Sequence, residues 1–253
     1  MDLRGRIVRK ILEKKELSLI DPRLVEKALS LYLKKNRFLI EKLSAAQLKI
    51  VIKDIRASLR ESVGRFQIGI KDRERLLEIG EIQKLLNTHS STKERIDFYP
   101  TLKEIIRKTG AKSILDLGCG INPLALADLK VKYYASDINL SDLNLVKNFF
   151  EKKKIDGEVF ICDLTKIENC KLPEVDLVLL LKVFDILGKE DYKIAKRVLE
   201  AIKSKHLIIS FSTRTLSGKK MNRPRRLWFE KLLNSSFYRF DTLSSANEIF
   251  YLV

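Results

Sequence analysis

The chain has 253 residues, of which 45% are hydrophobic and 33% charged; this balance excludes a disordered chain and is enough to bury a full core. The formal net charge of +17 indicates a polyanionic partner, for which we favour nucleic acid over a membrane surface because no basic amphipathic helix with an aromatic face is evident. Since the sequence has no run of 18 apolar residues and no signal-peptide core, we expect a cytoplasmic protein without a membrane segment.

Residues 1–87 are predicted to form an N-terminal helical domain. The signals are the apolar stripe Ile7–Leu12, the helix start Asp21–Pro22 and periodic apolar segments over 44–64 and 72–86. Because Lys and Arg outnumber Asp and Glu here, we expect this domain to dock on RNA backbone; a solvated helical bundle is the alternative.

A linking segment follows, in which Ser91 and Glu94 have the spacing of a capping box. They predict a helix that runs to about Lys108 and carries Arg95 in its second turn. Capping does not explain His89 or Arg95, so these two side chains call for another role.

The segment S-I-L-D-L-G-C-G, residues 113–120, reads as a buried strand followed by a glycine turn, and Asn122–Pro123 as the entry to a short helix. This unit is where α/β proteins bind nucleotides, although it is not G-x-G-x-x-G and a purely structural turn is the alternative. Two further strands end in acids, which predicts that Asp116, Asp137 and Asp163 share one edge of the sheet.

The remaining segments alternate between helix and strand. We expect helices over 141–153, 190–203 and 225–233, strands over 175–181 and 206–211, and a terminal antiparallel pair over 237–243 and 248–252. The pattern predicts an α/β protein of the class I, Rossmann-like type, with a mostly parallel seven-stranded sheet beside the N-terminal helices.

Several motifs occur in a fixed order: H-S-S-T-K-E-R, S-I-L-D-L-G-C-G-I-N-P-L-A-L, L-L-L-K, I-S-F with L-S-G-K, and L-W-F-E. Together they resemble the aminoglycoside-resistance 16S rRNA methyltransferases, which methylate N7 of a decoding-site guanosine, over residues 86–253. The resemblance implies a methyltransferase domain over 88–253, S-adenosylmethionine as cofactor with S-adenosylhomocysteine as product, and no metal. It also implies the small ribosomal subunit as partner, with no protein partner required.

The resemblance also implies roles for single residues. Arg95 would pair with the methionine carboxylate of the cofactor, Asp137 with the ribose hydroxyls, and Asp163 with the adenine amine. Asp116 would lie behind the sulfonium, with capping of the turn as the alternative. The expected cofactor-binding residues are Arg95, Asp116, Gly118, Gly120, Asp137, Ile138, Asp163, Leu164 and Leu181.

Methylation of N7 removes no proton, so no general base is expected, and the base is expected to enter beside Lys182, Phe184 and Asp185. Phe184 would either stack on it or belong to the core, and Asp185 stands where the family is expected to have proline. No Asn-Pro-Pro-Tyr or Pro-Cys motif follows this strand, which disfavours exocyclic-amine and cytosine C5 methylation.

The loop before the last helix is basic and contains no acid. Its cations, expected to grip rRNA phosphates, are Arg214, Lys219, Lys220, Arg223, Arg225 and Arg226. A solvated face is the alternative, and Trp228 and Phe229 are expected to anchor the helix in the core.

Cys119, Cys162 and Cys170 neither pair evenly nor have zinc spacing, so we expect three reduced core residues. Two other functions stay open: a class I methyltransferase acting on another rRNA or tRNA position, and a non-catalytic RNA-binding relic. The sequence does not separate a resistance role from a housekeeping one.

Overall fold

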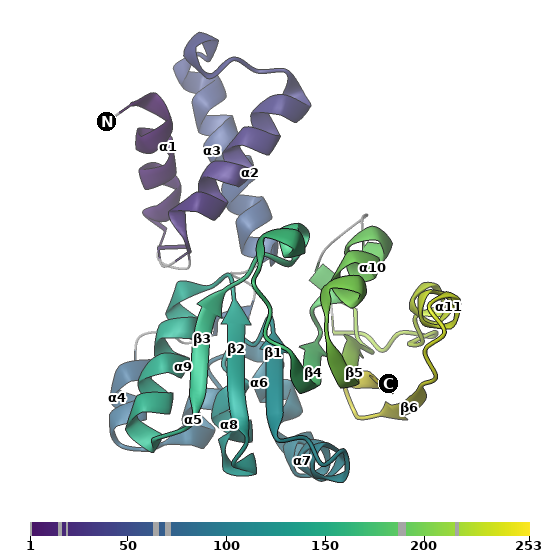
Figure 1. Cartoon of the computed structure of the whole chain (residues 1–253). Coiled ribbons are helices and arrows are strands. Elements are labelled where there is room, and N and C mark those ends of the chain that lie inside the picture. Colours follow the sequence, from purple (N-terminus) through teal and green to yellow (C-terminus); the bar gives the residue numbers. More distant parts are fainter. Residues whose placement is uncertain are drawn as a thin grey trace.

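The structure, a computed structural model, describes residues 2–14, 17–18, 20–62, 66–68, 72–186, 191–215 and 218–253. Its centre is a seven-stranded sheet with the strand order β3-β2-β1-β4-β5-β7-β6 (Figure 1). The strands are β1 Ser113–Leu117, β2 Lys132–Asp137, β3 Gly157–Ile161, β4 Val175–Leu181, β5 Ser204–Ser212, β6 Asp241–Ser244 and β7 Glu248–Leu252. The first five run parallel and β7 pairs antiparallel with β5 and β6, which confirms the predicted α/β class and the terminal pair.

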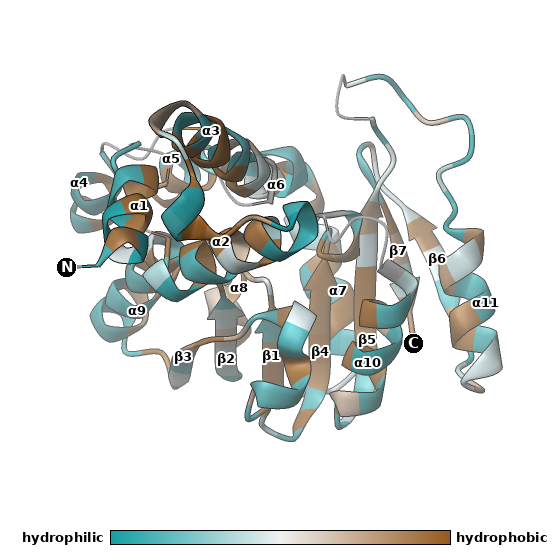
Figure 2. Ribbon diagram, turned by 90° about the horizontal axis from the view of Figure 1, so that it is seen from above, coloured by the Kyte–Doolittle hydropathy of each residue, from teal (hydrophilic) through white to brown (hydrophobic). Residues whose placement is uncertain are grey.

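The central strands bury both faces, as their continuous apolar sequences require. Alternate residues of β4 belong to two cores: Leu177 and Leu179 to one, Val178 and Leu180 to the other. The ribbon of β4 is coloured as hydrophobic (Figure 2). The first core includes side chains of α7 Tyr99–Lys108, α8 Pro123–Leu126 and α9 Leu140–Lys153. The second includes those of α10 Asp191–Ala201 and α11 Leu227–Ser235.

The N-terminal helices stand together above the edge at which β1, β2 and β3 end (Figure 1). They are α1 Leu3–Leu12, α2 Pro22–Asn36, the short η1 Ile40–Lys42 and α3 Ala45–Ser62. A core of their own, from Ile7 to Leu59, holds them together, and Asp21 caps α2 as its sequence predicts. Among the described residues, no helix is long and apolar enough to cross a membrane.

The continuous helix predicted over 72–86 is wrong. It is divided into α4 Arg73–Glu78 and α5 Ile82–Leu86, because the chain reverses at Gly80 with φ of +77°. Both pack into the first sheet core, through Leu77, Leu85 and Leu86. These two helices, within the predicted N-terminal segment 1–87, therefore pack against the sheet. Gly64, the expected end of the third helix, and Glu190, the expected start of another, lie outside the described residues.

The predicted capping box is also wrong. The helix α6 Ser90–Arg95 begins after His89 without a side-chain cap, and the chain then bends through η3 Ile96–Phe98 into α7. Glu94 does not reach back to the helix start, because its carboxylate binds the Lys182 ammonium. Three further short turns are η4 Ala127–Leu129, η5 Leu164–Asn169 and η6 Phe184–Ile186.

The expectation of three reduced cysteines holds for Cys119 alone, which is free and buried. Cys162 and Cys170 form a disulfide, because η5 turns the chain back and brings their Cα atoms to 5.6 Å. Burial raises the pKa of the Cys119 thiol well above its usual value, so this side chain remains a neutral small residue.

Candidate cofactor and RNA-binding site

A cavity of about 630 Å³ lies at the carboxyl edge of the sheet, beside the point where β2 and β4 leave β1 in opposite directions. A cavity of this size suits a ligand of nucleoside dimensions. Most of the predicted cofactor residues line it: Gly118, Gly120, Asp137, Ile138, Asp163, Leu164 and Leu181. Asp116 and Arg95 lie behind this lining, buried to 1% and 2% exposure.

The glycine turn leaves no room for side chains. Gly118 has a φ of +70°, and a Cβ there would lie 2.8 Å from Cγ2 of Val183. Gly120 has a φ of +49°, and a Cβ there would lie 2.9 Å from Nε2 of His89. The turn is held by the Ser136 carbonyl, which accepts from the N–H groups of Gly118 and Cys119. Glycine is therefore required at both positions by the packing of Val183 and His89, and both glycines line the cavity.

Asp137 organises the neighbouring strand end. Its Oδ2 accepts from the Gly120 N–H at 2.8 Å, and its Oδ1 accepts from the N–H groups of Ile138 and Asn139. Burial, and the nearby Asp142 carboxylate, raise the pKa of Asp137 to about 6. At neutral pH this carboxylate is an acceptor at the cavity wall, as ribose hydroxyls require.

Asp163 begins η5 and caps it. Oδ1 accepts from the Thr165 N–H at 3.0 Å and from its hydroxyl at 2.6 Å, while Oδ2 accepts from the ammonium of Lys27 at 2.5 Å. Burial alone would raise the pKa of Asp163, but the hydrogen bonds from Lys27 and Thr165 outweigh it and lower the pKa.

Asp116 does not cap the turn with its carboxylate. Oδ2 accepts from the Asn122 amide and from the Tyr133 hydroxyl, both at 2.7 Å, and Oδ1 has no hydrogen-bond partner among the residues that the structure describes. Asn122 in turn accepts from Tyr99 and Arg95. Asp116 therefore fixes the side chains beneath the glycine turn.

Burial raises the pKa of Asp116 to about 6, from 3.8, which predicts a pH effect on stability. Between these values the folded state holds the extra proton, so the free energy of unfolding should fall as pH rises, by about 3 kcal/mol in total. Denaturant titrations from pH 4 to 7 should show this loss in the wild type relative to Asp116→Asn, which cannot titrate. Parallel pH profiles would contradict the assignment.

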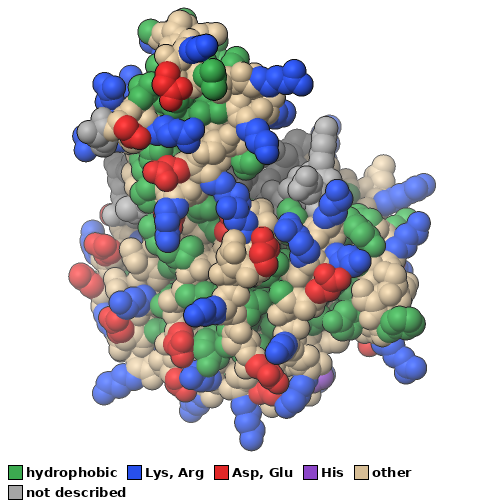
Figure 3. All heavy atoms as spheres, turned by 45° about the horizontal axis from the view of Figure 1, so that its top comes forward, with side chains coloured by type: hydrophobic (Ala, Val, Ile, Leu, Met, Phe, Trp, Pro, Cys, Tyr) green, Lys and Arg blue, Asp and Glu red, His purple; other side chains and the backbone are tan. Residues whose placement is uncertain are grey.

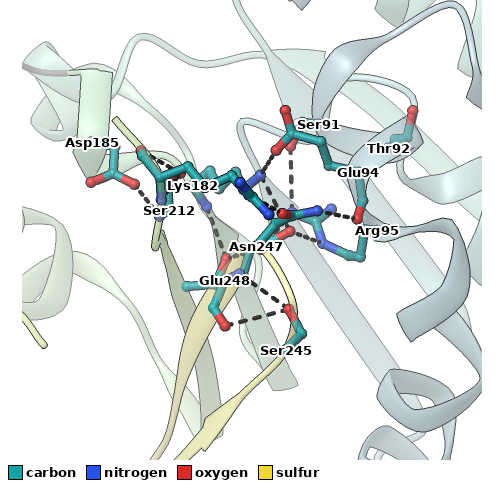
Figure 4. Close-up of polar contacts among 12 residues, drawn as sticks. Ser91, Thr92, Glu94, Arg95, Lys182, Asp185, Ser212, Ser245, Asn247 and Glu248 are labelled. Atoms are coloured by element: carbon teal, nitrogen blue, oxygen red, sulfur yellow. Dashed lines mark hydrogen bonds and ion pairs between the residues drawn. The ribbon is translucent and has the colours of Figure 1, made fainter. Parts of the chain in front are cut away.

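Arg95 is bound by Glu248, a partner that the sequence did not reveal (Figure 4). Its Nε and Nη2 donate to the two Glu248 oxygens at 3.0 and 2.9 Å, and its Nη2 also donates to Ser91, which lines the cavity. Glu248 also lies 3.5 Å from the Lys182 ammonium and accepts from the Ser210 hydroxyl. One bidentate face of Arg95 is thus taken by the protein itself.

The pocket after β4 differs from the expectation. Lys182 lines the cavity in a left-handed conformation, with φ of +59°, and Val183 beside it also lines the cavity. Of the two roles expected for Phe184, the structure shows the core role, because this ring is fully buried and packs against Phe211 and Phe229. Asp185 accepts from the Ser212 N–H and from Arg226, so it ties this turn to the next loop.

The basic loop contains two kinds of cation. Arg225 pairs with Glu230, and Arg226 pairs with Asp185 while lying over the Phe211 ring, so both have structural partners. Arg225 is exposed although it is paired, and Lys219, Lys220 and Arg223 are exposed as well.

Arg214 is half-buried, and its guanidinium donates to the Asn247 side chain, just before β7. This hydrogen bond holds the loop close to β7. Phe229 is buried and Trp228 packs against the same core, which confirms both as anchors. Lys and Arg side chains also spread over the N-terminal lobe and the face below it (Figure 3). Leu216 and Ser217 lie outside the described residues.

Sequence reasoning missed several residues of this site. They come from elements remote from the glycine turn and are Glu248, Ser210, Asp142 and Lys27. Among them, only Glu248, an acid at the start of the apolar strand β7, carried a signal. In the described part of the chain, no three His, Cys, Asp or Glu side chains are placed to hold a metal ion.

The sheet order, the bare glycine turn and the acids at the ends of β2 and β3 define a class I S-adenosylmethionine-dependent methyltransferase. The family model for ribosomal RNA methyltransferase (FmrO) matches residues 26–252. The chain belongs to this family of ribosomal RNA methyltransferases.

Individual relatives and solved structures to which the chain is similar are also 16S rRNA methyltransferases. The chain is 30% identical over 183 residues to a 16S rRNA (guanine(1405)-N(7))-methyltransferase of Serratia marcescens, covering 70% of this chain and 71% of that protein. It is similar to the 16S rRNA methyltransferase RmtF, solved with S-adenosyl-L-homocysteine, with a TM-score of 0.80, 25% identity and coverage of 100% of this chain and 98% of that one. The fold also matches the 16S rRNA methylase RmtB, with a TM-score of 0.79, 24% identity and coverage of 98% and 97%.

Proposed function

We propose that this protein methylates N7 of guanosine 1405 of 16S rRNA in the small ribosomal subunit, with S-adenosylmethionine as methyl donor, and so gives resistance to aminoglycosides. The observation that carries the proposal is the family match over residues 26–252, which includes the basic loop and the cavity residues other than Ile20 and Leu24. The 1405-specific relative supports the target. The reaction would take place in the cytoplasm, where ribosomes are exposed to the enzyme.

The cavity offers one contact to each part of the donor. The backbone of Gly118–Gly120 would lie against the methionyl and ribose portion, and Asp137 would accept the ribose hydroxyls. Asp163 would accept the adenine amine, with Leu164 and Leu181 as apolar neighbours. The residues therefore fit the group.

The methionine carboxylate is assigned to Arg95, and Glu248 decides how this contact is made. Because Nε and Nη2 bind Glu248 and Nη1 donates to Asn122, the carboxylate would meet the Nη1–Nη2 end of the guanidinium, where Nη2 also donates to Ser91. Glu248 then fixes the guanidinium in place. The Nε–Nη2 face of Arg95, which could form a bidentate pair with the methionine carboxylate, is taken by Glu248.

Chemistry at N7 asks the protein for position rather than for proton transfer. S-adenosylmethionine supplies an electrophilic methyl group, and the attacking lone pair of guanine carries no proton. Alignment of the two partners can lower the barrier by roughly 7–11 kcal/mol. Lys182 and Val183 form the cavity wall beside which the base would enter, and the Asp185–Arg226 pair holds that wall to the basic loop.

The rRNA would be gripped from two sides. We assign phosphate contacts to Lys219, Lys220 and Arg223, which are exposed, and to Arg214 at the base of the loop. Arg225 and Arg226 would act mainly by shaping the loop, because their guanidinium groups are bound to Glu230 and Asp185. The N-terminal helices would dock on neighbouring rRNA.

Incubation of small ribosomal subunits with enzyme and S-adenosylmethionine, followed by cleavage at N7-methylguanosine and primer extension, tests the proposal. We expect one new stop that reports guanosine 1405, and resistance to kanamycin and gentamicin in a sensitive bacterium that expresses the protein. The stop should be absent with Asp137→Ala. A stop at another nucleotide would reject the target and favour the alternative that Asp185 keeps open; cofactor binding without any stop would reject both.

A further inference from the structure

The N-terminal helices line the same cavity as the cofactor residues. Their contribution is apolar apart from a few side chains, and it comprises Ile20, Leu24, Lys27, Ala28, Leu31, Ser58 and Leu59. The helical lobe stands directly over the sheet edge (Figure 1). The cavity therefore has two walls, one from the sheet and one from the helices.

One charged contact joins the two walls. The Lys27 ammonium, on α2, donates to Asp163 Oδ2 and to the Thr165 hydroxyl, both at 2.5 Å. The two charged side chains retain only 24% and 21% of their exposure, so solvent screens this pair less than an ordinary surface pair. Lys27 lies 136 positions before Asp163, which makes the contact a tertiary one.

Two other contacts hold the helices in the same place. Ile20 forms an isolated β-bridge with Asn139, the residue that caps α9. Ile138, which follows Asp137, packs against the N-terminal core. The lobe is therefore in contact with the strand ends that carry both proposed cofactor acids.

The two oxygens of the Asp163 carboxylate have different hydrogen-bond partners. Thr165 supplies both donors to Oδ1, which leaves Oδ2 as the oxygen available to the cavity, and Lys27 provides one of the two hydrogen bonds that Oδ2 can accept. The remaining lone pair can accept the adenine amine while Lys27 stays in place. Lys27 thus fixes the acceptor and also holds the apolar wall against it.

We propose that the N-terminal helical lobe forms the second wall of the cofactor site and that Lys27 is the positioning residue that holds this wall on Asp163, next to the adenine. The proposal rests on the proposed function, since it concerns how S-adenosylmethionine is held. It gives the lobe a role in cofactor binding in addition to contact with RNA. The lobe and the adenine would both contact Asp163. Binding of the adenine is therefore linked to the position of the lobe.

Calorimetry with S-adenosylhomocysteine tests this role in Lys27→Met, with Lys34→Met, an exposed residue of the same helix, as matched control. We expect the Kd to rise about tenfold in Lys27→Met, as for loss of a charged hydrogen bond, and to stay unchanged in the control. Lys27→Arg should recover most of the affinity. Leu24→Ser, which alters the apolar wall without touching the ion pair, should raise the Kd by about fivefold.

Three readouts separate positioning from general damage. In methylation assays the KM for S-adenosylmethionine should rise in Lys27→Met while kcat at saturation is retained, and affinity for small subunits should equal that of Lys34→Met. In an Asp163→Asn background, Lys27→Met should change the Kd for S-adenosylhomocysteine little further. Unchanged or tighter binding in Lys27→Met, or an undiminished effect in Asp163→Asn, would overturn the proposal. A wild type that methylates guanosine 1405 in the same experiment keeps the proposed function separate from that failure.

Discussion

Replacement of Asp137 by alanine is expected to weaken S-adenosylmethionine binding by roughly 100-fold or more, since hydrogen bonds to a charged acceptor contribute about 1.5–3 kcal/mol each. The substitution removes the proposed acceptor of the ribose hydroxyls. It also frees the N–H groups of Gly120, Ile138 and Asn139, which the carboxylate now holds. Ligand contact and glycine-turn geometry are therefore lost together. Calorimetry with S-adenosylhomocysteine measures the loss.

Two further variants show whether the loss of affinity is specific to the Asp137 carboxylate. Asp156→Ala removes an exposed acid at the opposite end of the sheet and should leave the affinity unchanged. Asp137→Asn keeps one acceptor oxygen and should fall between the wild type and Asp137→Ala. Near wild-type affinity in Asp137→Ala, in a folded protein, would remove the ribose assignment.

Replacement of Glu248 by alanine is expected to lower the free energy of unfolding by about 3–5 kcal/mol, the cost of breaking a buried ion pair from one side. Glu248 is 1% exposed and its carboxylate binds Arg95, lies near Lys182 and accepts from Ser210. Burial would raise its pKa, but Arg95 and Lys182 outweigh burial and lower it, so the carboxylate is ionised at neutral pH. Without it, two cations remain buried without their shared partner. Denaturant unfolding measures the change.

The matched control is Glu151→Ala, which removes an exposed acid paired with Lys147 on α9 and should cost no more than about 0.5 kcal/mol. Glu248→Gln, which retains the shape and an acceptor, should be less damaging than Glu248→Ala. The double variant Arg95→Met with Glu248→Leu should be more stable than Glu248→Ala, because it leaves fewer unpaired charges. Equal stability of Glu248→Ala and the wild type would show that Arg95 is held by other groups.

The features of the cavity that follow from the sequence are local. The glycine turn between β1 and α8 follows from two positive-φ positions and a proline, and Asp137 and Asp163 follow strands whose direction the parallel sheet fixes. Neighbours along the chain determine these features, so the cavity residues Gly118, Gly120 and Asp137 need no knowledge of distant elements. The same holds for the continuous apolar strand β4.

The errors arise where distant segments meet. Glu94 has capping-box spacing, yet the ammonium of Lys182, 88 positions away, offers its carboxylate a stronger partner. For Phe184 the local sequence leaves both stacking and a core role open, and packing against the distant Phe211 and Phe229 decides for the core. Cys162 and Cys170 pair only because η5 doubles back.

The sequence by itself thus determined the class I fold, the glycine turn and the acids at the strand ends. These features depend on backbone conformation and hydrophobic periodicity, which consecutive residues specify. Tertiary structure alone decided that Glu248 holds Arg95 and that Lys27 closes the helical lobe over Asp163. Such contacts join side chains more than 130 positions apart, and their strength depends on burial and distance, which no local pattern specifies.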